Sequence, residues 1–190
     1  MARTAPVAGE RESLGEQTDT GLVQVLTGDG KGKTSAALGE VLRAAGQGLR
    51  VYVVFFMKGN YPYGEFNILP KLPNVTTASF GFTSLTDPAK VKPEEIEQAQ
   101  KALAAGRRAM LSGDYDMVVL DEVNVAAAWK LIGVEDLVKL IRDKPPGVEL
   151  VLTGRYAQSE VIELADLVTN MVKVKHPYDR GVLARKGIEF

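Results

Sequence analysis

The stretch Thr27-Gly28-Asp29-Gly30-Lys31-Gly32-Lys33-Thr34-Ser35 decides how the rest of this chain folds. It follows an apolar run at 22–26 and precedes a helical pattern that begins at Ala36. A strand, a glycine-rich turn and Gly-Lys-Thr at a helix start together form the layout of a phosphate-binding loop. The glycines allow a tight turn, which brings backbone N–H groups against phosphate oxygens. We therefore predict that residues 28–35 bind the phosphates of a nucleotide.

The loop departs from the usual spacing, G-x-x-x-x-G-K-[ST], at one position. That spacing places a glycine at 27, where this chain has Thr27, and glycines stand at 28 and 30 instead. The alternative is a Gly/Lys-rich surface turn with no ligand. The strand before the loop and the helix after it favour phosphate binding, with Lys33 as a positive charge and the Thr34 hydroxyl as a magnesium ligand.

Length and composition restrict the classes of function. The chain has 190 residues, enough for one well-packed domain, and its net charge of −1 does not favour nucleic-acid binding. It has no cysteine and one histidine, His176, which excludes disulfides, cysteine nucleophiles and multi-histidine metal sites. No apolar run approaches the roughly 20 residues that span a bilayer, and residues 1–20 lack a signal-peptide core. We expect a cytoplasmic protein that binds no membrane.

From Gly21 onward, strand and helix patterns alternate along the chain. Strands are expected at 22–27, 50–57, 74–80, 115–122, 148–153 and 167–174, and helices at 33–45, from Pro93 onward, at 134–142 and after a capping Ser159. A Gly/Pro/Tyr-rich connection spans 58–73, and the tail from His176 has no clear period. The polar residues 1–20 are expected to form a flexible arm.

These elements predict one α/β domain over 21–190. Its sheet of about six strands is expected to be mostly parallel, with helices on both faces, as in P-loop NTPases of the RecA-like kind. The strand at 167–174 is expected to lie in the core. In such sheets, ligands bind beyond the carboxyl ends of the strands.

Several residues at strand ends are candidates for chemistry. Asp121 and Glu122 end an apolar strand, where a carboxylate can hold a metal ion opposite Thr34, although they can instead cap the turn. Arg155 follows the strand at 148–153, and its guanidinium suits phosphate. For Arg43, on the helix after the loop, a solvated face is an equal alternative to phosphate contact.

Two phenylalanines and the histidine are harder to interpret. Phe80 and Phe82 flank a glycine in a Gly/Thr/Ser loop, where they can be core residues or an exposed apolar wall; composition leaves this open. His176, beside Pro177, is more typical of a turn than of a general base.

The phosphate-binding loop and four further blocks resemble the P-loop class of corrinoid adenosyltransferases, which act on cob(I)alamin or cob(I)yrinic acid a,c-diamide. The missing first glycine matches that family's own variant of the loop. The likeness spans about 21–190, and five blocks in the same order make it specific. The other blocks are Phe80-Gly81-Phe82-Thr83, Tyr115-Asp116 through Asp121-Glu122, Thr153-Gly154-Arg155 with Ala165 to Thr169, and Lys175-His176-Pro177 through Gly187-Ile188-Glu189.

The resemblance implies transfer of the 5′-deoxyadenosyl group of ATP to the cobalt of a reduced corrinoid, with release of inorganic triphosphate. Because Co(I) attacks the ribose C5′, the loop holds the leaving group, and ATP lies reversed relative to ordinary NTPases. No protein nucleophile or general base is needed. The triphosphate is held by Gly28, Asp29, Gly30, Lys31, Gly32, Lys33, Thr34 and Ser35, with Arg43, Arg155 and Mg²⁺ (or Mn²⁺) on Thr34 and on Asp121 or Glu122.

The resemblance also assigns the corrin site to residues 80–83. Phe82 packs against the lower face of the corrin and helps to exclude the axial ligand, which leaves four-coordinate cobalt that is easier to reduce; Phe80 and Thr83 belong to the same site. The family commonly has tryptophan where this chain has Ser84, so another residue fills that wall or a different corrinoid is preferred. A homodimer is implied, in which the arm at 1–20 covers the partner's site, and a reductase can serve as electron donor.

Two other classes of function stay open. A nucleoside kinase or small ATPase would use Glu122 beside the γ-phosphate as a base or to position water. A non-enzymatic nucleotide-sensing regulator would use residues 58–92 as a switch surface.

Overall fold

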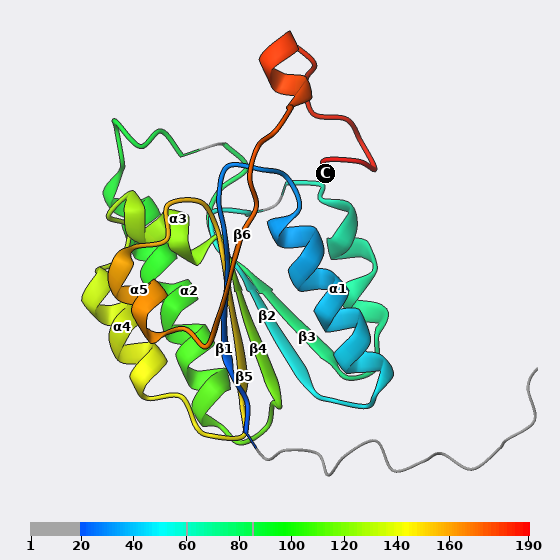
Figure 1. Ribbon diagram of the computed structural model, residues 1–190, viewed down its shortest axis with the longest axis vertical. Coiled ribbons are helices and arrows are strands. Elements are labelled where there is room, and N and C mark those ends of the chain that lie inside the picture. The colour runs from blue at the N-terminus through cyan, green and yellow to red at the C-terminus, as the bar shows by residue number, and fades with distance from the viewer. Residues whose placement is uncertain (1–19, 60, 85) are drawn as a thin grey trace, which may run out of the picture.

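A six-stranded parallel sheet forms the centre of the computed structural model, which describes residues 20–59, 61–84 and 86–190 (Figure 1). The spatial order is β3-β2-β4-β5-β1-β6, and every neighbouring pair is parallel. The predicted parallel sheet is therefore confirmed. The strands are β1 (Val23–Thr27), β2 (Val51–Phe55), β3 (Val75–Ser79), β4 (Met117–Asp121), β5 (Glu149–Thr153) and β6 (Leu167–Asn170).

Helices cover both faces of the sheet, as predicted (Figure 1). On one face α1 (Lys33–Gly46) packs with two short 3-10 turns, η1 (Gly64–Asn67) and η2 (Leu69–Lys71), around Val41 and Phe55. On the other face a larger core surrounds Leu120 and Leu152. That face carries α2 (Pro93–Leu111), α3 (Val123–Ala128), α4 (Val134–Arg142) and α5 (Ser159–Leu164).

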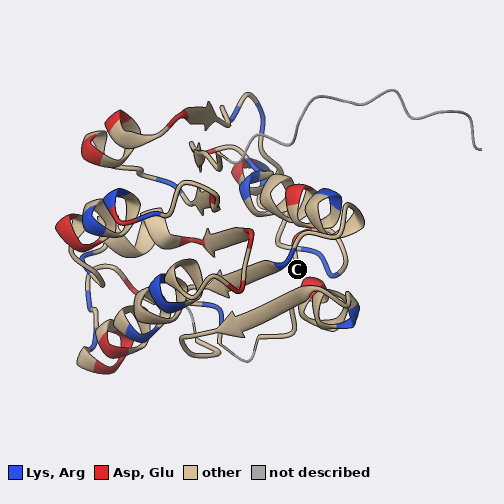
Figure 2. Ribbon diagram, turned by 90° about the horizontal axis from the view of Figure 1, so that it is seen from below, with Lys and Arg blue, Asp and Glu red and all other residues tan. Residues whose placement is uncertain are grey.

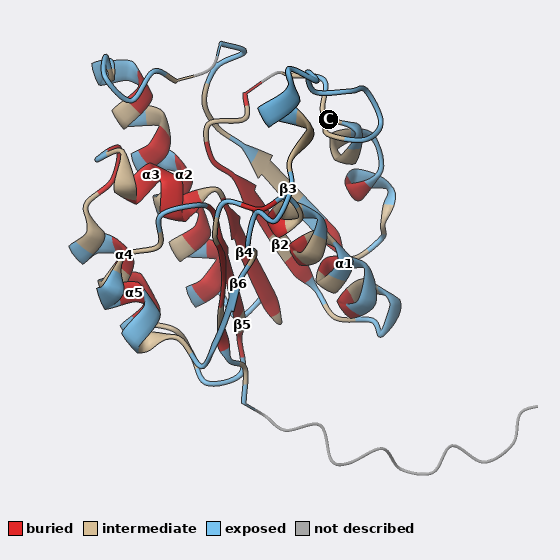
Figure 3. Cartoon of the chain, turned by 45° about the horizontal axis from the view of Figure 1, so that its top comes forward, coloured by how far each residue is buried: buried red, intermediate tan, exposed pale blue. Residues whose placement is uncertain are grey.

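The distribution of buried and charged residues follows this layered arrangement. Buried residues concentrate in the strands and on the inward sides of the helices (Figure 3). Charged residues of both signs lie mainly on the helices and loops (Figure 2). Within the described ranges, no helix combines the length and the apolar character of a membrane span.

Local sequence signals account for the start and the inner face of α2. Pro93 occupies the first helical position, and the Glu95 carboxylate accepts a 2.8 Å hydrogen bond from the backbone N–H of Lys92. Proline suits this position because the first helical N–H groups have no partner within the helix. Ala99 and Met110 are buried against the sheet, as their helical spacing predicts.

Three sequence-based expectations for the second half of the chain need correction. α3 was not predicted, because six residues are too few to show a helical period. Ser159 is the first residue of α5, not its cap: Gln158 holds the cap position, and the Ser159 hydroxyl donates to Glu160.

The flexible arm expected at residues 1–20 is not one of these corrections, because all of it except Thr20 lies outside the described residues.

The third correction concerns β6, which is an exposed edge strand that ends at Asn170, not a core strand that continues to residue 174. The backbone leaves the sheet there and crosses the phosphate-binding loop. Met171 donates from its N–H to the Thr27 carbonyl at 2.8 Å, and its own carbonyl accepts from the Gly30 N–H at 2.7 Å. Met171 therefore holds the loop through two backbone hydrogen bonds, one to Thr27 and one to Gly30.

This crossing explains why glycines stand at 28 and 30. Gly28 has φ of 95°, and a Cβ there would collide with the Asn170 side chain and the Met171 backbone. A Cβ on Gly30 would lie 2.7 Å from the Met171 carbonyl oxygen. The off-pattern glycines are required by a segment more than 130 residues further along the chain.

Substitution of Gly30 should therefore destabilise the fold. We expect Gly30→Ala to lower the free energy of unfolding by about 1–3 kcal/mol, because the backbone of Met171 must shift. Urea denaturation measures this change. The matched control is Gly39→Ala in α1, where a Cβ meets nothing within 4 Å and alanine favours the helix. Equal stability of the two variants would contradict the close packing of Met171.

Candidate functional site

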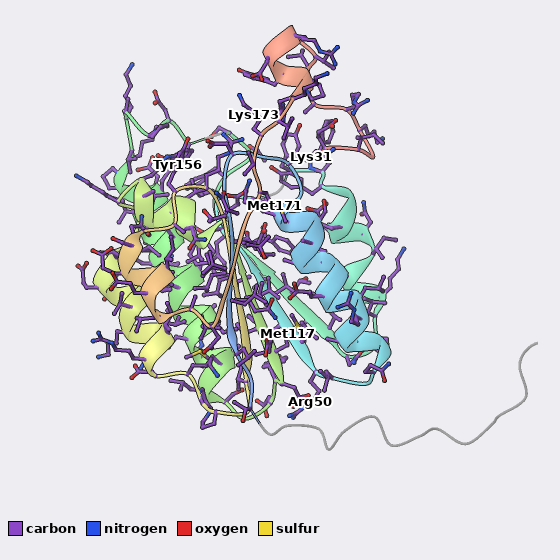
Figure 4. All side chains as sticks on the ribbon, viewed as in Figure 1. Lys31, Arg50, Met117, Tyr156, Met171 and Lys173 are labelled. Carbon is purple, nitrogen blue, oxygen red and sulfur yellow. The ribbon has the colours of Figure 1, made fainter. Side chains whose placement is uncertain are left out.

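A cavity of about 570 Å³ lies at the carboxyl ends of the strands, beside the phosphate-binding loop. This volume is within the range of small-molecule sites. Figure 4 shows Lys31, Met171 and Tyr156 toward this end of the sheet, and Arg50 and Met117 toward the opposite end. The lining residues are Asp29 to Ser35, Leu38, Lys58, Tyr63, Gly64, Glu65, Glu122, Arg155, His176 and Gly187 to Phe190.

The loop curls around its own lysine. The ammonium of the buried Lys33 donates to the carbonyl oxygens of Gly28 and Gly30, both at 2.7 Å. Burial lowers the pKa of Lys33, and the nearby charge of Glu122 opposes that shift. Lys33 is also the first residue of α1, so the positive end of this helix dipole faces the same cavity. The arrangement therefore favours an anion.

Asp121 is fully engaged within the protein. Its carboxylate pairs with the Lys58 ammonium at 2.7 Å, and the two side chains are only 1% and 11% exposed. The second carboxylate oxygen accepts from the Thr153 hydroxyl at 2.7 Å, and that hydroxyl accepts from the backbone N–H of Glu122 at 2.9 Å. Asp121 does not line the cavity, so its role is to hold the strand ends together.

Glu122 is placed differently from its neighbour. It adopts a left-handed conformation, with φ of 65°, and lines the cavity. Burial and the charge of Asp121 raise the pKa of Glu122, while Lys58, Lys33 and Arg155 act in the opposite direction. Of the two acids, only Glu122 therefore lines the cavity.

The cavity offers oxygen ligands of the kind that Mg²⁺ prefers. Thr34 contributes a hydroxyl and Glu122 a carboxylate. The described residues include no cluster of three or more His, Cys, Asp or Glu side chains that would hold a metal alone. This donor set fits a magnesium ion that completes its shell with phosphate oxygens and water, which is its usual mode of binding with nucleotides.

The two arginines proposed from sequence have different positions. Arg155 lines the cavity, directly after β5, as its place at a strand end predicts. Arg43 lies in the last turn of α1, is exposed and does not line the cavity. Ten residues of helix separate it from Lys33, a rise of roughly 15 Å. The structure therefore places Arg43 on the solvated face of α1, which was the alternative interpretation.

Phe80 and Phe82, which the sequence could not assign to the core or to the surface, lie in different environments in the structure. Phe80 is partly buried and packs against the larger core. Phe82 is 40% exposed, and Thr83 and Ser84 beside it are exposed as well. None of these residues lines the nucleotide cavity. Phe82 therefore remains available as an apolar contact for a second ligand, whereas Phe80 supports the fold.

Sequence analysis did not identify Lys58 or the end of the chain as parts of the site. Lys58 follows β2 at its carboxyl end, the same signal that identified Arg155. Lys31 donates to the Glu189 carboxylate at 2.8 Å and to the Ile188 carbonyl at 3.0 Å, which fixes the C-terminal residues over the loop. The tail had no periodic pattern, so only its packing could place it here.

A family model described as ATP:corrinoid adenosyltransferase BtuR/CobO/CobP matches residues 19–190. The chain belongs to this family. The corrinoid adenosyltransferase of Escherichia coli (strain K12) is 34% identical over 174 residues, which cover 92% of this chain and 88% of the relative. The corrinoid adenosyltransferase of Pseudomonas aeruginosa is 35% identical over 190 residues, which cover 100% and 93%.

A solved structure shows a similar fold. The cytoplasmic domain of EssC aligns with 87% of this adenosyltransferase chain and with 34% of its own chain, with a TM-score of 0.51. At 14% sequence identity, this likeness concerns the fold alone. Family membership makes the chain a transferase that uses ATP and a corrinoid.

The two adjacent acids should respond differently to substitution. Asp121→Asn leaves Lys58 buried without its counter-charge, and we expect the free energy of unfolding to fall by about 3 kcal/mol. Glu122→Gln should not lower it. The raised pKa of Glu122 means that its stabilising contribution is present at low pH and is lost as pH rises through that pKa.

Urea unfolding at neutral pH measures both effects, and the Mg²⁺ concentration that gives half-maximal activity provides a second readout. Glu122→Gln should raise that concentration at least tenfold, about 1.4 kcal/mol of metal affinity. A Glu122→Gln variant that loses stability but binds Mg²⁺ normally would reverse the two assignments.

Proposed function

We propose that this adenosyltransferase transfers the 5′-deoxyadenosyl group of ATP to Co(I) of a reduced corrinoid and releases inorganic triphosphate. The observation that carries this proposal is the family match over 19–190, which includes every residue that lines the nucleotide cavity. In the reaction, the electron pair of Co(I) forms the bond to C5′. The bond from C5′ to the triphosphate oxygen breaks, and its electron pair leaves with the triphosphate.

The protein's contribution to this step is to bind and to neutralise the leaving group. Lys33 now donates to two loop carbonyls, and a triphosphate would give its ammonium stronger, charged acceptors. Arg155 and loop residues 29–35 line the same space. Fixed positive groups stabilise charge that develops in a transition state, because they need no reorganisation during the reaction.

Thr34 and Glu122 would hold Mg²⁺ or Mn²⁺ beside the triphosphate. The ion supplies further positive charge against the departing oxygens. Glu122 would be ionised in that state, because a cation close to a carboxylate favours its charged form. Lys58 stays paired with Asp121 and keeps that acid from competing for the metal.

Phe82 would contact the lower face of the corrin. Its exposure on the loop after β3 supports this role, because a core phenylalanine would be buried. Phe80, which packs against the core, would hold the loop in place and not contact the corrin itself.

We also propose that the enzyme is a homodimer and that a reductase supplies the electrons that reduce the cobalt of the corrinoid substrate. Exposed apolar side chains on the open sheet edge, Leu167 and Val168 of β6, support a surface that another protein covers. Further exposed apolar residues, Val172 and Val174, continue along the same segment.

The products of the reaction test the proposed chemistry. With ATP, Mg²⁺ and a chemically reduced corrinoid under anaerobic conditions, we expect an adenosylated corrinoid and intact triphosphate in equal amounts. The corrinoid spectrum and anion-exchange chromatography of the phosphates measure the two products. ADP and phosphate with an unchanged corrinoid would indicate a kinase or ATPase instead. Nucleotide binding without either product would indicate a regulator.

Lys33 should be essential for turnover. We expect Lys33→Ala to reduce kcat/KM by at least 100-fold, because it removes the charge closest to the leaving group. Circular dichroism should show an unchanged fold, and the exposed Lys139 of α4 provides a matched Lys→Ala control. Full activity of the Lys33→Ala variant would mean that the loop does not hold the triphosphate.

A further inference from the structure

Strained backbone in the described chain concentrates around one place. Among the described residues, the non-glycine positions with left-handed φ angles are Met57 (55°), Glu122 (65°), Lys130 (59°) and Tyr156 (64°). Such conformations are strained for residues other than glycine and are typical of functional sites. Three of the four line a single recess of about 340 Å³, and the fourth, Lys130, follows Trp129, which lines it too.

The recess adjoins the nucleotide cavity. Lys58, Tyr63, Glu122 and Arg155 line both spaces, so these polar side chains stand between them. A molecule in the recess would therefore lie directly beside a nucleotide bound at the loop. No step proposed above for triphosphate binding uses the recess itself.

The other walls of the recess are mainly apolar. Phe56, Met57 and Val125 come from the ends of β2 and from α3, and two larger aromatic side chains, Trp129 and Tyr156, complete the walls. Tyr156 is 54% exposed, so its ring is accessible to a molecule in the recess. Thr86, on the segment that follows Phe82, also lines the recess.

We propose that this recess receives one edge of the corrin, with Trp129 and Tyr156 as its aromatic wall. The proposal rests on the proposed function, because it requires a corrinoid substrate. A corrin is broader than the recess, and its rim carries methyl groups and amide side chains. Aromatic faces suit the apolar rim, and the hydroxyls of Thr86 and Tyr156 provide hydrogen-bonding partners for the amides.

The position of the recess gives this occupant a mechanistic advantage. A corrin edge held here would lie directly beside the nucleotide, because Lys58, Glu122 and Arg155 line both the recess and the cavity at the loop. The strained residues would then fix the wall in place before the substrate arrives, because a backbone held in one conformation cannot relax away from the ligand. Trp129 would supply the large aromatic surface that Ser84 does not.

Trp129 is the only tryptophan of the chain, so all tryptophan emission originates at the wall of this recess. The full-length protein is titrated with hydroxocobalamin, and free N-acetyltryptophanamide serves as the control for absorption of light by the corrinoid. We expect saturable quenching beyond that control. Mg²⁺-ATP alone should leave the emission nearly unchanged. Quenching by ATP alone would place the adenine in the recess and overturn the proposal.

Substitutions at Trp129 provide a second measurement, with binding followed by equilibrium dialysis. Trp129→Ala should weaken hydroxocobalamin binding about tenfold and leave the KM for ATP unchanged, and Trp129→Phe should restore most of the affinity. Tyr178→Ala is the matched control, because this exposed aromatic residue does not line the recess. Thermal unfolding identifies any variant that fails to fold; the titration of the unsubstituted chain needs no variant.

Different results would contradict the proposed adenosylation activity and the proposed corrin contact in the recess. Absence of any adenosylated corrinoid from the wild-type chain would contradict the proposed function. Normal adenosylation, together with unquenched Trp129 emission or unchanged affinity of Trp129→Ala, would overturn the assignment of the recess alone. Loss of ATP affinity in Trp129→Ala would also overturn it, because the recess would then belong to the nucleotide.

Discussion

The buried ion pair between Lys58 and Asp121 is the interaction on which the rest of the site depends. It joins the carboxyl ends of β2 and β4, and the bond from Thr153 to Asp121 extends the network to β5. Burial alone would lower the pKa of Lys58, but its pairing and hydrogen bond with Asp121 outweigh burial and raise that pKa. Removal of either charge would leave the other buried and uncompensated, which is far more costly than loss of an exposed pair.

This network also separates the tasks of two adjacent acids. Asp121, the last residue of β4, is bound to Lys58 and Thr153 and does not line the cavity. Glu122 then turns through a left-handed conformation into the cavity, and its backbone N–H is bound by the Thr153 hydroxyl. The strained backbone and the unfavourable burial of the Glu122 carboxylate are tolerated because the neighbouring ion pair holds the turn in place.

The phosphate-binding loop depends on a second long-range contact. Met171 binds Thr27 and Gly30 through its backbone, and the C-terminal Glu189 binds Lys31. The loop is thus shaped by residues from the other end of the chain. A loop already held in its binding conformation loses less conformational entropy when the nucleotide arrives. The same contacts explain why glycine is needed at 28 and 30 in this protein.

Sequence alone determined the layers and the chemistry of the loop. The buried run of β2 and the strand–loop–helix pattern around Lys33 predicted a parallel sheet with phosphate bound at its carboxyl edge, because hydrophobic periodicity and glycine geometry are local properties. Only the tertiary structure decided which side chains meet there. It excluded Arg43 from the nucleotide cavity, brought in Lys58 and the tail, and assigned Asp121 and Glu122 different partners. A strand-end position can indicate a residue such as Lys58, but its partner Asp121 lies far away in the chain, and only the folded structure shows such contacts.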